Sequence, residues 1–299
     1  MIEPAALFAL CAALLLALRD IFGRIGLRGV DPILGTGASA LLGLPVLALV
    51  SALAGDFQHP WPGLGRPLLL IAVSGTLRIT AARTLLFAAT QYVGSARAGT
   101  LAATSTFFAI FLGVSFLGER LTLPLGAGAA LVVCGYVLLV QRRAGPKGAE
   151  PPAGHLLGIG LALLSALAFG ASSALVRPAV GGFASPNQAN LYANAFAVAA
   201  YLPFVWWRMR RGEGVSGWSG RTWGVLALAG SVAALGVTFL YLALARAPVV
   251  FAVPIVQSRP LFVVAISWAF FQTEERVTWR VAAGAAVIVA GTALLIGGR

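Results

Sequence analysis

Long apolar stretches separated by short polar breaks run along the whole chain. A helix needs about 20 mostly apolar residues to cross a bilayer, and stretches of that length recur throughout the sequence. The breaks contain Gly, Pro and polar residues, which are typical of turns. The pattern predicts ten membrane-spanning helices, at residues 4–25, 33–54, 67–90, 96–117, 121–141, 155–177, 187–207, 222–245, 248–271 and 277–297.

One polar stretch rich in Pro and Gly, residues 141–155, separates the first five predicted helices from the last five. The two halves are related, because residues 119–139 align with residues 275–295 without a gap. Both segments begin with Glu-Arg and contain the string AGAA. Their glycines also recur, and we expect these to allow close helix packing; Gly128 and Gly135 match Gly284 and Gly291.

An odd number of helices in each half has a topological consequence. After five spans the chain is on the other side of the membrane, so the second copy must enter upside down. Inverted repeats are a recurring architecture of secondary transporters, with the substrate site near the midplane between the copies. We therefore predict an all-α integral membrane protein with two inverted five-helix repeats, residues 1–145 and 146–299.

Composition supports a multi-pass protein of the inner membrane. Hydrophobic residues make up 59% of the chain and charged residues only 10%, whereas about 25% charged residues is ordinary for soluble domains. The first apolar stretch lacks a basic leader and a small-residue cleavage site, so we interpret it as a retained span. Cys11 and Cys134 lie inside apolar runs and are expected to be small core residues without a disulfide or metal.

Basic residues outnumber acidic ones by 21 to 9. Most of those in loops fall in the odd-numbered connections, including Arg142, Arg143, Lys147 and the segment 208–211. The positive-inside rule then places these connections in the cytoplasm and both termini outside. No basic run is long enough to predict nucleic-acid binding.

Several arginines fall inside the predicted spans, where each costs about 2.5–3.5 kcal/mol on insertion scales. Arg78, Arg83 and Arg259 have no acid within reach in the sequence. Buried charges must be paired or stand in water, so they predict a water-filled cavity that an anionic substrate enters. A guanidinium suits a bidentate contact with carboxylate or phosphate. The alternative, that arginines near helix ends extend to the interface, is expected for Arg24, Arg97 and Arg246.

Helical geometry predicts which of these arginines line the cavity. Arg78 and Arg83 are five residues apart, which is about 140° around an α-helix, so both should not face one point. We expect Arg83 to line the cavity and Arg78 to flank it. Arg259 precedes Pro260, which disfavours helical geometry at that point.

Other polar positions complete the predicted cavity. Asn187, Asn190 and Asn194 share one helix face, and Tyr241, Gln257 and Ser258 lie in the following spans. Hydrogen bonds between helices, worth about 1 kcal/mol each, are the structural alternative for any one of them. Asp20 is the one acid at depth and could pair with Arg24 at i,i+4, either structurally or in coupling.

The chain resembles the EamA-type family of the drug/metabolite transporter superfamily. The resemblance rests on the two five-span halves, the Glu-Arg pairs before a Gly-rich last helix, and the segment from Tyr241 to Arg276 with Pro260 in the ninth span. The first half departs from the pattern, with Thr104 at the equivalent of that proline and Arg19-Asp20 at the equivalent of Phe169-Gly170. The resemblance implies the fold and transport as such, but not a particular substrate.

We therefore predict a secondary transporter for a small anion bearing phosphate or carboxylate, working by alternating access and exchange. The alternatives are a flippase for a phosphorylated lipid and an exporter of amino acids or other neutral metabolites or drugs. An enzyme is not expected, because His59 and His155 lack partners at catalytic or ligand spacing. The partners predicted are the substrate and the bilayer, without a cofactor, in a monomer or homodimer.

Overall fold

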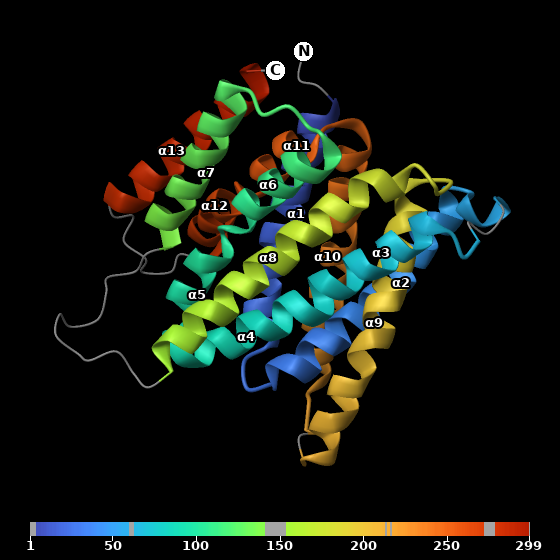
Figure 1. Ribbon diagram of the computed structural model, residues 1–299. Helices are drawn as coiled ribbons and strands as arrows, with labels where there is room; N and C mark the ends of the chain where they lie inside the picture. The colour runs from blue at the N-terminus through green and yellow to red at the C-terminus, as the bar shows by residue number, and fades with distance from the viewer. Residues whose placement is uncertain are drawn as a thin grey trace.

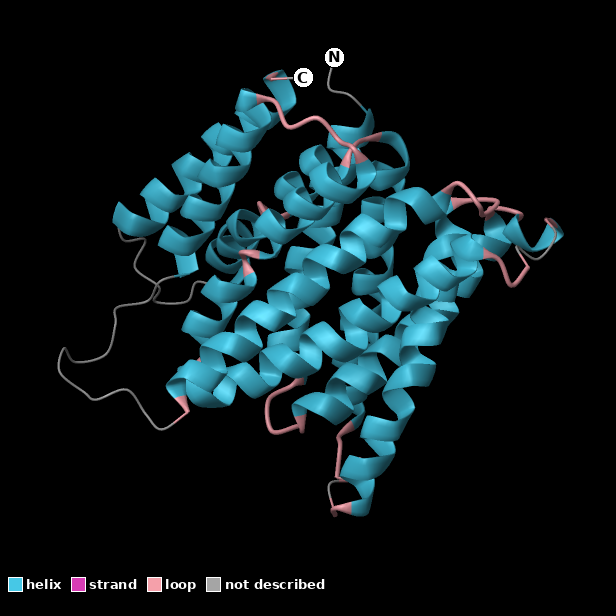
Figure 2. Cartoon of the chain, viewed as in Figure 1, coloured by secondary structure: helices cyan, strands magenta, loops and turns pink. Residues whose placement is uncertain are grey.

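The computed structural model describes residues 4–59, 63–140, 154–212, 214–215, 217–271 and 279–298. All regular elements in these ranges are helical (Figure 2). They are α1 (Pro4–Gly26), α2 (Pro32–Leu53), η1 (Asp56–Gln58), α3 (Arg66–Thr76), η2 (Leu77–Ala81), α4 (Ala82–Val93), α5 (Ser95–Ala102), α6 (Ser105–Leu117), α7 (Leu123–Val140), α8 (His155–Val180), α9 (Pro186–Arg210), α10 (Gly220–Arg246), α11 (Val249–Val256), α12 (Arg259–Phe271) and α13 (Trp279–Gly297).

Seven helical stretches in the described part of the chain are long and apolar enough to cross a membrane. They correspond to the predicted spans one to four, six, eight and nine. Helices α7 and α13 are apolar but shorter in their described portions, and α9 carries the polar asparagines. The chain is therefore a multi-pass, all-helical membrane protein in its described part.

Three of the predicted spans are not single helices. The third is α3 and α4 joined by the π-helical segment η2, the fourth is α5 and α6, and the ninth is α11 and α12. The fourth breaks at residues 103–104 and the ninth at residues 257–258. The break in the fourth span includes Thr104, and the break in the ninth lies two residues before Pro260, the matching position of the other half, so each half interrupts its fourth helix near the same position.

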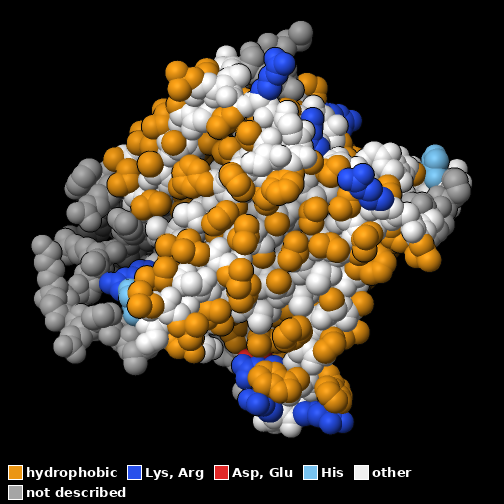
Figure 3. Space-filling view, in the orientation of Figure 1, with side chains coloured by type: hydrophobic (Ala, Val, Ile, Leu, Met, Phe, Trp, Pro, Cys, Tyr) orange, Lys and Arg blue, Asp and Glu red, His pale blue; other side chains and the backbone are white. Residues whose placement is uncertain are grey.

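Small side chains let the helices approach closely. Along α1, Ala6, Ala9, Ala12 and Ala13 are completely buried, and α1 packs along α10. Small residues at helix contacts are typical of membrane proteins, in which association depends on close packing. Figure 3 shows hydrophobic side chains across the middle of the visible face and basic ones toward its ends.

Helices α7 and α13 pack against each other at one edge of the molecule (Figure 1). A Cβ atom on Gly128 would lie 2.9 Å from the carbonyl oxygen of Gly291, and one on Gly135 would lie 2.8 Å from that of Gly284. These distances confirm that the repeated glycines allow close packing. Because the earlier glycine of α7 meets the later glycine of α13, the two helices are antiparallel. The Glu275-Arg276 pair of the second copy lies outside the described residues.

Candidate functional site

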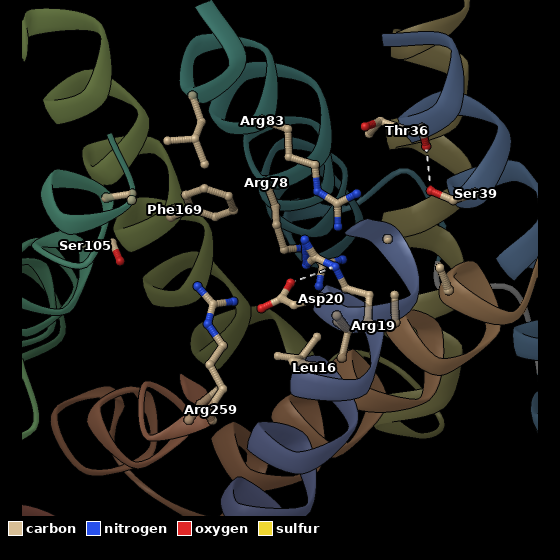
Figure 4. A pocket seen from close by; sticks show the side chains of 18 of the residues that line it. Leu16, Arg19, Asp20, Thr36, Ser39, Arg78, Arg83, Ser105, Phe169 and Arg259 are labelled. Carbon is tan, nitrogen blue, oxygen red and sulfur yellow. Dashed lines mark hydrogen bonds and ion pairs between the residues drawn. The ribbon is translucent and has the colours of Figure 1, made fainter. Parts of the chain in front are cut away.

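A cavity of about 380 Å³ lies among the helices, lined by residues of α1, α2, α4, α5, α6, α7, α8, α10, α11 and α12 and of η2. Its walls include Leu16, Phe87 and Phe169, together with polar groups such as Thr36 and Ser105 (Figure 4). Its charged lining residues are Arg19, Asp20, Arg24, Arg78, Arg83 and Arg259. The cavity is thus strongly cationic.

A π-helical turn brings two of these arginines to the same side. The backbone N–H of Ala82 donates to the carbonyl of Leu77, five residues earlier. In such a turn residues five apart lie on one face, instead of about 140° apart as in an α-helix. Arg78 and Arg83 consequently both line the cavity. The prediction that they could not face one point was wrong, because it assumed 3.6 residues per turn throughout.

The guanidinium groups of these two arginines have donors without acceptors. Nε and Nη2 of Arg78 and Nε of Arg83 are buried and have no hydrogen-bond partner among the described residues. The Cζ atom of Arg78 lies 5.6 Å from the centroid of the Tyr241 ring, which attracts the cation through its π face. A buried donor left unsatisfied costs about 1–3 kcal/mol, or more when charged. The cavity therefore presents cationic donors that an acceptor would satisfy.

Asp20 stands between Arg259 on one side and Arg19 on the other (Figure 4). The Nε of Arg19 lies 3.3 Å from Oδ1 of Asp20, and each side chain is 27% exposed. The structure thus pairs Asp20 with Arg19. The i,i+4 spacing in the sequence had suggested Arg24 as the partner instead. Arg259 interacts electrostatically with Asp20 and lies within hydrogen-bonding reach of Tyr136. Arg259 therefore does have an acid nearby, supplied by a helix distant in the sequence.

The other described acids have partners outside the cavity. Asp31 caps α2 and pairs with Arg208 of α9. Asp56 accepts a hydrogen bond from the hydroxyl of Ser185 at 2.8 Å. Glu119 pairs with Arg177 and accepts from the start of α11. Within the described part of the chain, Asp20 is the one acid that lines the cavity.

The polar residues named from the sequence are divided between the cavity and the helix contacts. Gln257 lines the cavity, 3.5 Å from Ser105 between Nε2 and Oγ. The Ser258 hydroxyl donates to the carbonyl of Ile255 at 2.7 Å and is buried beside the helix break. Tyr241 lies beside the cavity, next to Arg78.

Asn190 lies at the contact between α9 and α10, with Asn194 bonded to it. Asn190 donates to the carbonyl of Ala234 at 3.1 Å and to the hydroxyl of Thr238 at 2.9 Å. Asn194 donates back to the side chain of Asn190 at 2.8 Å, and Asn187 lies in the first turn of α9. These are not among the residues that line the cavity, and the bonds of Asn190 and Asn194 match the structural alternative.

Sequence reasoning missed Tyr136, which lines the cavity from α7. A lone tyrosine in a Gly-rich apolar helix has no local signal of function. The repeat alignment offers the one available hint, since it places the polar Thr292 opposite Tyr136. Arg19 was visible as a charge near a helix end, but its role beside Asp20 depends on the folded arrangement.

Comparisons with known proteins agree with this architecture. A family model described as the EamA-like transporter family matches residues 3–141 and again residues 156–297. A Sinorhizobium protein named "Uncharacterized transporter in cobO 3'region" is 32% identical over 132 residues, covering 44% of this chain and 93% of that protein. A protein of known crystal structure matches with a TM-score of 0.78 over 98% of this chain and 96% of its own, at 21% identity. The last likeness concerns the fold alone.

Proposed function

Because the chain belongs to the EamA-like transporter family, whose members are membrane transporters, we propose that it moves a small anionic metabolite. The substrate carries a phosphate or carboxylate group and binds in the central cavity. The observation that carries this proposal is the pair Arg78 and Arg83, whose buried donors lack acceptors among the described residues. The described lining of the cavity contains one acid, Asp20. An anion bound there satisfies the donors and balances the charge.

Alternating access between two inverted repeats is the mechanism we infer. The family model matches each half separately, and the equivalent helices α7 and α13 run antiparallel across their glycines. Each half also packs its first span against the third span of the other half. In the first half this is α1 along α10, and in the second half it is α8 along α3 and α4. When α7, α9 and α13 are added to the seven long apolar stretches, the protein has ten spans, five in each repeat. The cavity then lies between the two repeats.

Exchange is the mode of transport that the charges favour. Closing an empty cavity would remove Arg78 and Arg83 from water without a counter-ion, which is costly. A bound anion compensates for this cost, so the loaded protein changes conformation more readily than the empty one. We therefore infer that one anion must be exchanged for another. Proton antiport through Asp20 is not the mode we infer, because this carboxylate forms an ion pair with Arg19 at 3.3 Å.

The test measures anion binding to purified full-length protein. Isothermal titration with inorganic phosphate and with succinate compares the wild type with Arg78→Gln and Arg83→Gln. Each substitution should weaken binding at least about tenfold, since it removes a charged donor from the anion. Arg97→Gln is the matched control, because Arg97 is exposed and outside the cavity lining. Unchanged affinity in both cavity variants would show that these arginines are structural.

A further inference from the structure

The end of α9 carries two aromatic residues that are each followed by an arginine four positions later. The pairs are Trp206 with Arg210 and Trp207 with Arg211, and residues four apart lie on one face of a helix. The structure accordingly places Cζ of Arg210 3.8 Å from the centroid of the Trp206 ring. Cζ of Arg211 lies 4.0 Å from the centroid of the Trp207 ring. Each ring attracts its cation but offers no lone pair, so the guanidinium donors still need acceptors.

These four side chains form an exposed surface, which we call the α9-end patch. Trp206 is 57% exposed and Trp207 is 43% exposed, and both arginines are exposed as well. Neither arginine forms an ion pair with another described residue, and Glu213 lies outside the described residues. Residues 206–223 contain four arginines and one acid, a formal net charge of +3. The patch is therefore both aromatic and cationic, and its charge exceeds what the local sequence can neutralise.

Arg208 shows which side of α9 faces the rest of the protein. It pairs with Asp31, the N-cap residue of α2. Arg210 follows two positions later, about 200° around an α-helix, so it lies on the side away from α2. Figure 1 shows the end of α9 projecting from the body of the molecule, and Figure 3 shows basic side chains beside hydrophobic ones there. The patch therefore faces the surroundings of the protein.

The length of α9 places the patch at the membrane surface. Its 25 residues span about 37 Å, whereas the hydrocarbon core of a bilayer is about 30 Å thick. The helix end therefore reaches the headgroup region, where tryptophan is enriched because its ring is amphipathic. A helix C-terminus also favours cations, which accounts for the arginines alone but not for the two exposed rings beside them.

We propose that the α9-end patch binds the phosphate of an anionic phospholipid of the bilayer. Arg210 and Arg211 donate to the phosphate oxygens from planar forks, and the two tryptophan rings hold these forks at headgroup level. Phosphatidylglycerol keeps its negative charge, whereas phosphatidylcholine cancels it with its own cation, so the basic patch favours the former. None of the four side chains lines the cavity, so the site does not depend on the transport proposed above.

The test measures which lipid lies beside the tryptophans. Full-length protein is reconstituted into phosphatidylcholine bilayers that contain brominated phosphatidylglycerol or, separately, brominated phosphatidylcholine. Bromine quenches the fluorescence of tryptophans in contact with the lipid, and four of the seven tryptophans lie in residues 206–223. In the wild type, the apparent affinity for phosphatidylglycerol should exceed that for phosphatidylcholine at least about fivefold.

Three double variants test the arginines. Arg210→Gln with Arg211→Gln should lower this lipid preference to less than about twofold. Arg66→Gln with Arg120→Gln is the matched control and should keep the preference, since both residues are exposed and lie at the connections of α2 with α3 and of α6 with α7. Arg210→Lys with Arg211→Lys keeps the charges but replaces each planar fork by a compact ammonium, and should lower the preference at least about twofold.

Four outcomes would overturn the proposal. Equal affinity for the two lipids in the wild type would assign the patch to an acidic protein or to no ligand. Equal loss in the control variant, or full retention in the lysine variant, would reduce the effect to general attraction by surface charge. Loss of the preference in Arg83→Gln would place the lipid in the cavity instead. If the glutamine variant does not fold, as judged by its melting curve, the wild-type ranking and the lysine variant decide.

Discussion

A guanidinium inside a membrane protein needs an acid, another polar group or water to replace its lost hydration. Here Arg208 has Asp31 and Arg177 has Glu119, whereas Arg78 has the ring of Tyr241 and donors that no described group accepts from. Arg208 and Arg177 each have an acid, although Nε of Arg208 is also buried without a partner among the described residues, whereas Arg78 and Arg83 have buried donors and no ion pair there. This difference is the basis for proposing Arg78 and Arg83 as binding groups.

Arginine and lysine should not be interchangeable at these positions. Arg83→Lys keeps the positive charge but replaces a planar fork by a compact ammonium, which cannot make the bidentate contact. We expect phosphate affinity to fall by about tenfold, with the thermal stability unchanged or higher. Calorimetric titration beside a melting curve measures both quantities. Full retention of affinity in the lysine variant would indicate that charge alone matters.

Residue types could be predicted from the sequence better than their partners. Arg83 and Arg259 were expected in the cavity because membrane arginines without nearby acids need water. The approach of Asp20 to Arg259 joins α1 to α12, about 240 residues apart in the chain, and no local pattern encodes it. Asn190 and Asn194 share a helix face as expected, but that periodicity could not distinguish a cavity wall from a contact with α10.

The π-helical segment η2 accommodates one extra residue within the helical span formed by α3 and α4. Deleting Ala81 should convert the π turn to an α turn with Arg78 and Arg83 four residues apart, which still places them on one face. Phosphate binding should therefore survive. Inserting an alanine after Ala81 separates them by six residues and turns Arg83 away, so binding should be lost. Equal loss in both variants, measured by calorimetry, would contradict this account.

Glu119 joins three elements. Its side chain is 4% exposed, lies 3.1 Å from Nε of Arg177, and accepts from the backbone N–H groups of Val249 at 2.8 Å and Val250 at 3.0 Å. A carboxylate at the start of a helix is stabilised by those donors and by the helix dipole. The contact ties the connection between α6 and α7 to α8 and to α11 of the other half.

Glu119→Gln should destabilise the protein by about 1–3 kcal/mol, because it removes the charge that the three donors share. The measurement is the melting temperature in detergent. Arg120→Gln is the matched control, since its side chain is adjacent but exposed and should change little. A melting temperature equal to that of the control variant would mean that the contact adds nothing to stability.

The apolar pattern predicted the extent of most helices but not their interruptions. Hydropathy responds to about 20 residues at once, so it merges α3 with α4 and α5 with α6. The interruption before α12 had a signal in Pro260, because proline disfavours helical geometry at the preceding residue. The π turn had none, since its residues are ordinary helix formers apart from Ile79 and Thr80, and its bond pattern depends on packing.

In the whole molecule, the start of α1 and the end of α13 lie at the same end (Figure 1). The cavity extends to Arg24, Leu27 and Gly35, at the connection of α1 with α2, which is the opposite end. That end also carries the described basic segment 208–211, whereas Arg142, Arg143 and Lys147 lie outside the described residues. The cavity therefore extends toward the more basic end.

The basic end should face the cytoplasm, which leaves both termini outside. A C-terminal fusion to a reporter active only in the cytoplasm should accordingly be inactive, and one active only outside should give signal. The same reporters placed in the connection between α9 and α10 should give the reverse result and serve as the control. Activity of the cytoplasmic reporter at the C-terminus would reverse the orientation.

The excess of arginines over acids in the cavity has a consequence for the membrane potential. One unit charge moved through the whole field is worth about 2.3 kcal/mol per 100 mV. When one dianion is exchanged for another of equal charge, no net charge crosses and the voltage does no work on the complete cycle. Return of the empty cavity would instead complete a cycle that carries the full charge of the substrate. The fixed arginines would thus make electroneutral turnover the easier route in an energised membrane.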